Sequence, residues 1–180
     1  MEKVGSAAVN RRVALFVATL VGVGFGAYNV YWPPVDLTPS AALAVFLVLS
    51  VPLTAVVHEL THGLTSRLLG YRPRYGFKPP LVYVTFDEKV TALHYKVIAL
   101  APFVAVSAAC VALVAWRVVP QLFYFCLMIN VMGAVGDLWA TARLLFRNRG
   151  YWVQDTKSGF DLYRETPSAP AAAGGPPRAG

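Results

Sequence analysis

The chain has 180 residues, enough for one domain, of which 57% are hydrophobic and only 14% are charged. This composition is far from that of an ordinary soluble domain and indicates a polytopic membrane protein. The net charge is +7, but the basic residues cluster at the ends of apolar stretches and form no basic patch with interleaved aromatic residues. The composition therefore argues against a nucleic-acid-binding protein.

Four apolar stretches follow one another along the chain, each long enough to cross a bilayer as a helix. They cover about residues 13–31, 41–69, 97–119 and 122–146. The first stretch has an alternative interpretation as a cleavable signal peptide, but it is long for one and no small-residue cleavage site follows it. Before the second stretch, Thr38 is expected to cap the helix, with Pro39 at its first position.

The polar segments between and after these stretches contain β-prone runs. Residues 81–86 and 90–95 are separated by a turn at Asp87-Glu88-Lys89, and this arrangement predicts a β-hairpin. A second hairpin is predicted over residues 151–164. The sequence therefore predicts an all-α polytopic membrane protein, with four transmembrane helices and one or two short β-hairpins at the cytoplasmic surface.

The distribution of Lys and Arg predicts the orientation in the membrane. Three segments are basic, namely residues 1–12, 70–96 and 147–165. Residues 33–40 contain neither Lys nor Arg. By the positive-inside rule we expect a multi-pass protein of the cell membrane with both termini in the cytoplasm.

One membrane-embedded domain is expected to account for most of the chain. We expect this domain to cover residues 1–165, with its core at about 41–165. Residues 166–180 are mostly Pro, Ala and Gly, a composition that predicts a disordered tail.

One motif in the second apolar stretch combines residues that apolar packing does not explain. His58-Glu59-Leu60-Thr61-His62 has the pattern HExxH. Two imidazoles four positions apart lie on one face of a helix and can hold a single metal ion. Glu59 between them can act as general base toward a metal-bound water. The alternative, that these side chains serve only hydrogen bonds between helices, conflicts with the cost of ionisable groups in a membrane.

Asp137 is the candidate for a third ligand, because it is the only carboxylate after the motif that falls within an apolar stretch. An unpaired carboxylate costs at least about 2.5–3.5 kcal/mol in the bilayer, and binding a cation removes that cost. His62 and Asp137 are expected at depths of roughly 10 and 14 Å from the same membrane surface. The histidines and Asp137 are therefore predicted to meet. His94, the third histidine, is interpreted as an interfacial residue, with a ligand role as the alternative.

Asn130 precedes Asp137 by seven residues, so both project from nearly the same helix face. Its amide can donate to a peptide carbonyl or to a developing oxyanion of a substrate. It can equally form a hydrogen bond between helices. The sequence leaves both alternatives open.

These motifs resemble those of the putative zincin peptidases, a family of small integral membrane proteins. The resemblance rests on His58 to Gly63, followed by Asn130 and by Gly136-Asp137. The chain is more distantly similar to site-2 proteases, although it lacks their prolines between Asn and Asp, and Leu138 replaces their following glycine. The resemblance implies zinc ligation by His58, His62 and Asp137.

The resemblance further implies that Glu59 is the catalytic acid and base and that Asn130 positions the substrate. The expected function is that of an intramembrane zinc metalloendopeptidase. Its cofactor would be Zn²⁺, its substrate a membrane protein or peptide, and its other partner the lipid bilayer, with no role for nucleic acid. Two alternatives remain, a non-catalytic membrane adaptor and a metal-binding transporter. The sequence gives no indication of the oligomeric state.

Overall fold

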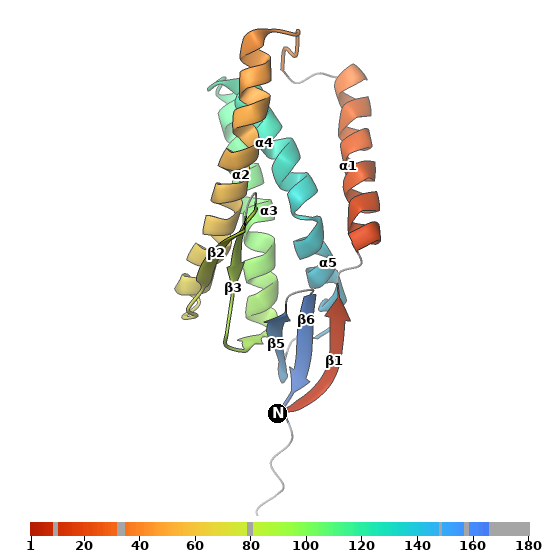
Figure 1. Ribbon diagram of the computed structural model, residues 1–180, viewed down its shortest axis with the longest axis vertical. Coiled ribbons are helices and arrows are strands. Elements are labelled where there is room, and N and C mark those ends of the chain that lie inside the picture. The colour runs from red at the N-terminus through yellow and green to blue at the C-terminus, as the bar shows by residue number, and fades with distance from the viewer. Residues whose placement is uncertain (9–10, 32–34, 79–80, 148, 157–158, 166–180) are drawn as a thin grey trace, which may run out of the picture.

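The computed structural model is an elongated helical bundle with an antiparallel sheet at one end (Figure 1). It describes residues 1–8, 11–31, 35–78, 81–147, 149–156 and 159–165. The helices are α1 (Arg11–Tyr31), α2 (Ala41–Leu68), α3 (Ala92–Ala115), α4 (Pro120–Gly133) and α5 (Val135–Arg143). The strands are β1 (Glu2–Ala8), β2 (Arg74–Lys78), β3 (Leu81–Thr85), β4 (Val90–Thr91), β5 (Tyr151–Thr156) and β6 (Gly159–Arg164). The predicted tail, residues 166–180, lies outside the described residues.

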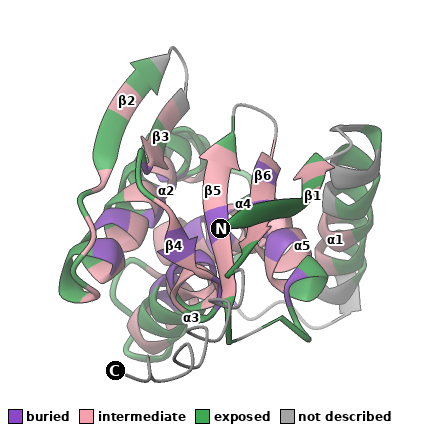
Figure 2. Cartoon of the chain, turned by 90° about the horizontal axis from the view of Figure 1, so that it is seen from below, coloured by how far each residue is buried: buried purple, intermediate pink, exposed green. Residues whose placement is uncertain are grey.

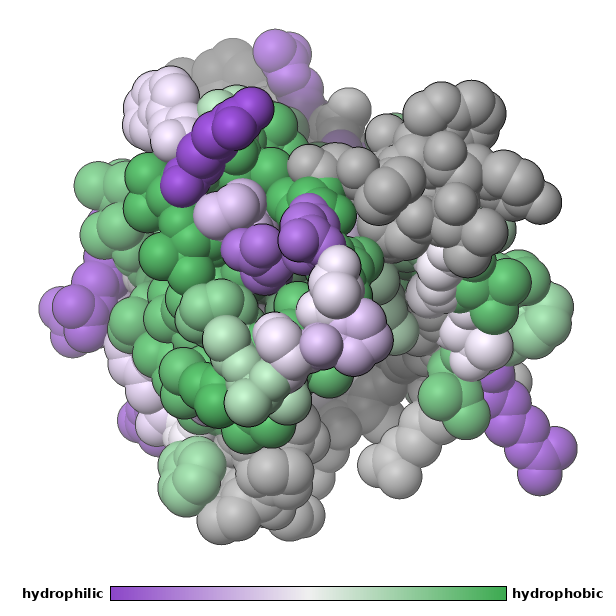
Figure 3. All heavy atoms as spheres, turned by 90° about the horizontal axis from the view of Figure 1, so that it is seen from above, coloured by the Kyte–Doolittle hydropathy of each residue, from purple (hydrophilic) through white to green (hydrophobic). Residues whose placement is uncertain are grey.

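Three helices of the described part of the chain are long and apolar enough to cross a membrane. They are α2, α3 and the segment Pro120–Arg143, in which α4 and α5 count as one span. Only 17% of the most apolar window of α2 is buried within the protein, as expected for a helix in contact with lipid. Figure 3 shows hydrophobic side chains over most of the coloured surface at the end of the bundle away from the sheet.

The prediction of a mostly helical fold with several candidate membrane spans is therefore confirmed. The count of four transmembrane helices stays a prediction, because the apolar part of α1 within the described residues extends only from Leu15 to Ala27.

Helices α2 and α3 each begin at a polar capping residue. Ser40 caps α2 by accepting a hydrogen bond from the Leu43 N–H at 3.1 Å. The prediction that Thr38 is this cap was wrong, because the Thr38 hydroxyl donates instead to the Asp36 carboxylate at 2.6 Å. Thr91 caps α3, so the helix begins at Ala92, five residues earlier than predicted.

The larger sheet has the strand order β1-β6-β5-β4, with antiparallel pairing throughout. Its β5–β6 pair, with Trp152 opposite Tyr163, confirms the hairpin predicted near the C-terminus. Strand β1 was not predicted, because the N-terminal segment was interpreted only as a basic flank of a helix. It pairs with β6 and thereby brings the N-terminus to the C-terminal hairpin.

The hairpin predicted between residues 81–86 and 90–95 was wrong. Strand β3 pairs with β2, which precedes it in the chain, and β4 pairs with β5 instead. Only Val90 and Thr91 are extended, since the residues after them form the first turn of α3. Val90, which is 1% exposed, lies opposite Val153 and joins the two parts of the chain.

A hydrophobic core attaches the sheet to the bundle. Leu144 and Val153 are fully buried and pack with Ala92, Phe160 and Leu162. Figure 2 shows buried residues where β4, β5 and β6 lie over the helices. The core therefore fixes β5 relative to the ends of α3 and α5.

The last apolar span is broken at Ala134, where a single continuous helix was predicted. Ala134 has φ −71° and ψ 0° and separates α4 from α5. Gly133 and Gly136 flank this point, and both lower the local helix propensity. The break places Asp137 in the first turn of α5.

Candidate metal centre

The predicted ligands converge at one place between α2 and α5. His58 and His62 lie one turn apart on α2, with ring centroids 4.9 Å apart. The Asp137 Oδ2 atom lies 3.1 Å from His58 Nε2 and 3.4 Å from His62 Nε2. One possible ligand atom from each of the three residues lies within 4.8 Å of the others. The structure thus brings together the three residues that the sequence predicts as ligands.

Each imidazole is oriented by a hydrogen bond from its other nitrogen. His58 Nδ1 lies 2.9 Å from the Asn130 side-chain oxygen, and His62 Nδ1 lies 2.8 Å from the Ile98 carbonyl oxygen. Both partners are acceptors, so each Nδ1 must carry its ring's proton. The lone pair of each Nε2 is therefore directed toward Asp137, which is the tautomer that a metal ligand requires.

The donor set fits a zinc ion. Two unprotonated ring nitrogens and a carboxylate oxygen all offer electron pairs to the same small space, an arrangement that is favourable when a cation lies between them. Tetrahedral zinc with bonds of about 2.0–2.2 Å holds neighbouring ligand atoms about 3.3 Å apart. The distances of 3.1 and 3.4 Å from Asp137 to the histidines match this geometry.

Asn130 belongs to the site as the partner of a ligand. Its side chain is fully buried, and its amide nitrogen donates to the Pro102 carbonyl at 3.1 Å and to the Ser107 hydroxyl at 3.0 Å. Both N–H groups of the amide are thus engaged with α3, while the oxygen holds His58 on α2. This is the interhelical alternative that the sequence left open. A role of Asn130 in binding the substrate stays a prediction.

Glu59 is held by the backbone of a strand. Its Oε2 accepts a hydrogen bond from the Val84 N–H of β3 at 2.9 Å. The hairpin of β2 and β3 can approach α2 this closely because residue 63 is glycine. A Cβ atom at Gly63 would overlap the Tyr75 hydroxyl. Sequence reasoning missed this contact, because it assigned β3 a different partner and placed the hairpin at the membrane surface.

A cavity of about 940 Å³ opens beside the ligands. His62 and Asp137 form part of its wall. The rest of the wall comes from the end of β3 and the two residues that follow it (residues 83–87), from residues 154–156 of β5, and from Tyr95, Ile98 and Ala99 of α3. The cavity thus connects the candidate metal centre with the edges of two strands.

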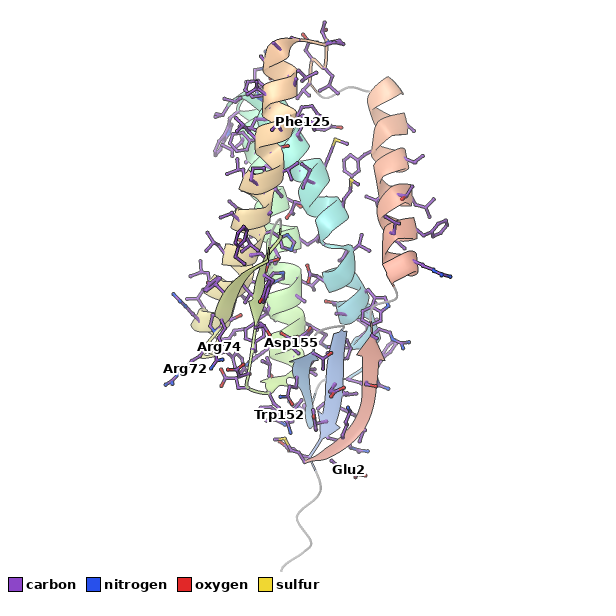
Figure 4. All side chains as sticks on the ribbon, in the orientation of Figure 1. Glu2, Arg72, Arg74, Phe125, Trp152 and Asp155 are labelled. Carbon is purple, nitrogen blue, oxygen red and sulfur yellow. The ribbon has the colours of Figure 1, made fainter. Side chains whose placement is uncertain are left out.

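Asp155 lines the same cavity and was not singled out by the sequence. Tyr95 donates its hydroxyl to Asp155 Oδ1 at 2.9 Å. Burial raises the pKa of the Asp155 carboxyl to about 6, and the hydrogen bonds from Tyr95 and the Phe86 N–H offset only part of this effect. Figure 4 labels Asp155 where β5 meets the lower end of α3. The sequence signal was weak, because a carboxylate in a predicted turn is normally solvated.

His94 does not join the ligands. Its Nδ1 lies 2.8 Å from the Tyr71 hydroxyl, in a contact between the segment after α2 and the first turn of α3. The alternative of a ligand role in this cluster is therefore not supported, and the interpretation of His94 as an interfacial residue stays a prediction.

The fold and the site define a class, that of mostly helical proteins with candidate membrane spans and a converged set of two histidines and an aspartate. Residues 38–152 match the model of a family described as putative zincin peptidase. The match covers well over half of the chain, which therefore belongs to this family. Searches among curated proteins and among solved structures gave no match. The more distant similarity to site-2 proteases stays a prediction.

Proposed function

We propose that the protein is an intramembrane zinc endopeptidase. The observation that supports this most strongly is the convergence of His58, His62 and Asp137, with both imidazoles in the tautomer needed for ligation. The ligands belong to two of the three candidate membrane spans. Membership of a family described as putative zincin peptidase favours proteolysis over other zinc chemistry.

In this proposal His58, His62 and Asp137 hold the ion, and Glu59 transfers the protons. When bound, zinc supplies Lewis acidity that activates water and polarises a peptide carbonyl. Val84 fixes one oxygen of the Glu59 carboxylate, which leaves the other oxygen to accept the proton of the attacking water. Glu59 then delivers this proton to the leaving amine.

The substrate is proposed to bind as an extended segment in the cavity beside the ligands. A transmembrane helix satisfies its own backbone, so its carbonyls become available only where it unwinds. Strand β4 pairs only with residues 152–153 of β5. Residues 154–156 on the same edge of β5 line the cavity, so their backbone is available to pair with a substrate strand.

This binding mode is tested with a photo-crosslinking amino acid in an inactive protein. At Thr156, inside the cavity, it should capture a bound substrate. At Arg72, outside the cavity, it should not. Equal capture at both positions would rule out binding along β5.

The two rival functions are a non-catalytic adaptor and a metal-binding transporter. Neither explains Glu59, which does not ligate the metal in this arrangement but is held next to the ligands by a backbone hydrogen bond. The proposed location is the cell membrane, with both termini in the cytoplasm. Because β1 pairs with β6, the two ends of the described chain lie next to each other, which supports their location on the same side of the membrane.

The decisive experiment compares wild type with Glu59→Gln after purification in detergent without chelator. We expect stoichiometric zinc in both proteins and cleavage of a membrane-protein substrate in wild type alone. Absence of zinc from wild type would refute the metal centre. Cleavage by the variant at the wild-type rate would refute the role of Glu59.

A further inference from the structure

A second cavity, of about 440 Å³, lies at the junction of the bundle and the sheet. Its walls come from residues 4–7 of β1, from Phe160 and Leu162 of β6, and from the segment that ends α5. Figure 1 shows β1 and β6 beside the lower end of α5. None of the residues of the metal centre lines this cavity, so the proposed peptidase chemistry leaves it unexplained.

Two arginines give the cavity a strong positive charge. Arg143 and Arg147 both line it, and no carboxylate lies within ion-pair distance of either among the residues that the structure describes. The nearby Lys3, by contrast, is neutralised by Asp161 at 2.7 Å. The Arg143 guanidinium lies 5.8 Å from the centre of the Trp139 ring, a contact that restrains its orientation. Within the described part of the chain, the cavity therefore has two charged donors and no counter-ion.

The cavity lies where a candidate membrane span ends. Arg143 is the last residue of the candidate span Pro120–Arg143, so the cavity lies at the level where that span leaves the hydrocarbon. Phe146 also lines the cavity and is 93% exposed, and the adjacent Leu145 is 55% exposed. An exposed aromatic and an exposed aliphatic side chain beside paired arginines form an amphipathic site at an interface.

We propose that this cavity binds the phosphate group of an anionic phospholipid. The planar guanidinium group donates two parallel hydrogen bonds to phosphate oxygens. Because Arg143 and Arg147 line the same cavity, both can donate to a phosphate group bound there. A free phosphate ion shares this chemistry. The lipid is the better ligand, because Phe146 and Leu145 add contacts for acyl chains that a free ion does not use.

The test measures lipid binding to the full chain in detergent micelles by native mass spectrometry, with phosphatidylglycerol and phosphatidylcholine as probes. We expect preferential binding of phosphatidylglycerol by wild type. The double variant R143Q/R147Q should bind it about tenfold or more weakly. The matched control is R72Q/R74Q, which removes the same charge from exposed positions outside the cavity and should bind like wild type. An equal loss in both double variants would mean general charge attraction and would overturn the proposal.

A second variant keeps the proposal testable if R143Q/R147Q does not fold. Ala142→Trp keeps both arginines but fills the cavity from an exposed wall position, and it should also lose the phosphatidylglycerol preference. Retained preference in Ala142→Trp would overturn the cavity as the site. Inorganic phosphate is the third probe. We expect it to compete only weakly, and complete displacement of the lipid at micromolar phosphate would overturn the choice of a lipid ligand.

Discussion

At the residue scale, the site is held together by groups other than the three candidate ligands. The Asn130 oxygen and the Ile98 carbonyl each fix the proton of one imidazole, and Val84 fixes one oxygen of Glu59. The orientation of the two histidines therefore depends on α3 and α4, and the orientation of Glu59 depends on β3. Mutations at these supporting positions separate metal binding from catalysis.

Asn130→Ala tests whether Asn130 orients a ligand or binds the substrate. Loss of the acceptor for His58 Nδ1 should lower zinc affinity about 10–100-fold, measured by competition with a chromophoric chelator. Ser107→Ala removes one acceptor of the Asn130 amide and leaves its bond to His58, so its effect should be smaller. Wild-type zinc affinity combined with lost cleavage in Asn130→Ala would instead favour substrate binding.

Asp155 predicts a pH dependence of stability. Burial raises the pKa of this carboxyl to about 6 in the folded protein, above the ordinary value of 3.8. The folded state therefore binds the proton more tightly, and the stability from this group is present at low pH and is lost as pH rises through 6. Between pH 7 and pH 5 the metal-free wild type should gain about 1 kcal/mol, or roughly 2–4 °C in Tm, relative to Asp155→Asn.

The control for this prediction is Asp87→Asn, which removes an exposed carboxylate paired with Arg74. It should keep the wild-type dependence of Tm on pH. If Asp155→Asn shows the same pH dependence as wild type, the Asp155 carboxyl does not titrate in this range.

At the scale of the elements, the hairpin of β2 and β3 positions Glu59 in the site. It lies along α2 because Gly63 leaves room for Tyr75, and its free edge then directs the Val84 N–H to Glu59. Val82 lies two residues earlier on the same edge, since alternate backbone N–H groups of a strand point to the same side. The two valines therefore offer a matched pair of positions.

Val84→Pro should impair catalysis without loss of zinc. Proline removes the N–H that holds Glu59, while it leaves the pairing of β3 with β2 intact. A hydrogen bond to a charged group contributes about 1.5–3 kcal/mol, so cleavage should fall roughly 10–100-fold at unchanged zinc content. Val82→Pro should cleave at nearly the wild-type rate. Equal losses in both variants would mean that proline disrupts the hairpin as a whole.

The elements differ in how far the sequence could predict them. The apolar spans, the β5–β6 hairpin and the ligand set follow from composition, local turn residues and spacing. The pairing of β3 with β2 and of β4 with β5 could not be predicted in this way. Val90, for example, belongs to a strand only because it pairs with Val153, which is far away in the sequence. Strand β1 likewise has mostly exposed side chains and becomes a strand through its pairing with β6.

At the scale of the whole molecule, the candidate metal centre connects two candidate membrane spans, α2 and the segment Pro120–Arg143. His58 and His62 belong to α2, whereas Asp137 belongs to α5, which the break at Ala134 separates from α4. The two ring nitrogens and the Asp137 carboxylate all offer electron pairs to the same place, so a bound cation attracts all three side chains. A bound cation should therefore stabilise the packing of these spans as well as the local site.

Removal of zinc should lower the thermal stability of the intact protein in detergent. Zinc bound by the folded state alone at 1,000 times its Kd contributes about 4 kcal/mol, so Tm should fall by roughly 8–16 °C after dialysis against a chelator. Glu59→Gln keeps all three ligands and should show the same fall and the same recovery when zinc is added back. Asp137→Ala should have a low Tm that neither treatment changes, because its ligand set no longer joins the two spans. A fall in Tm for Asp137→Ala as large as that of wild type would show that zinc stabilises the protein at some other place.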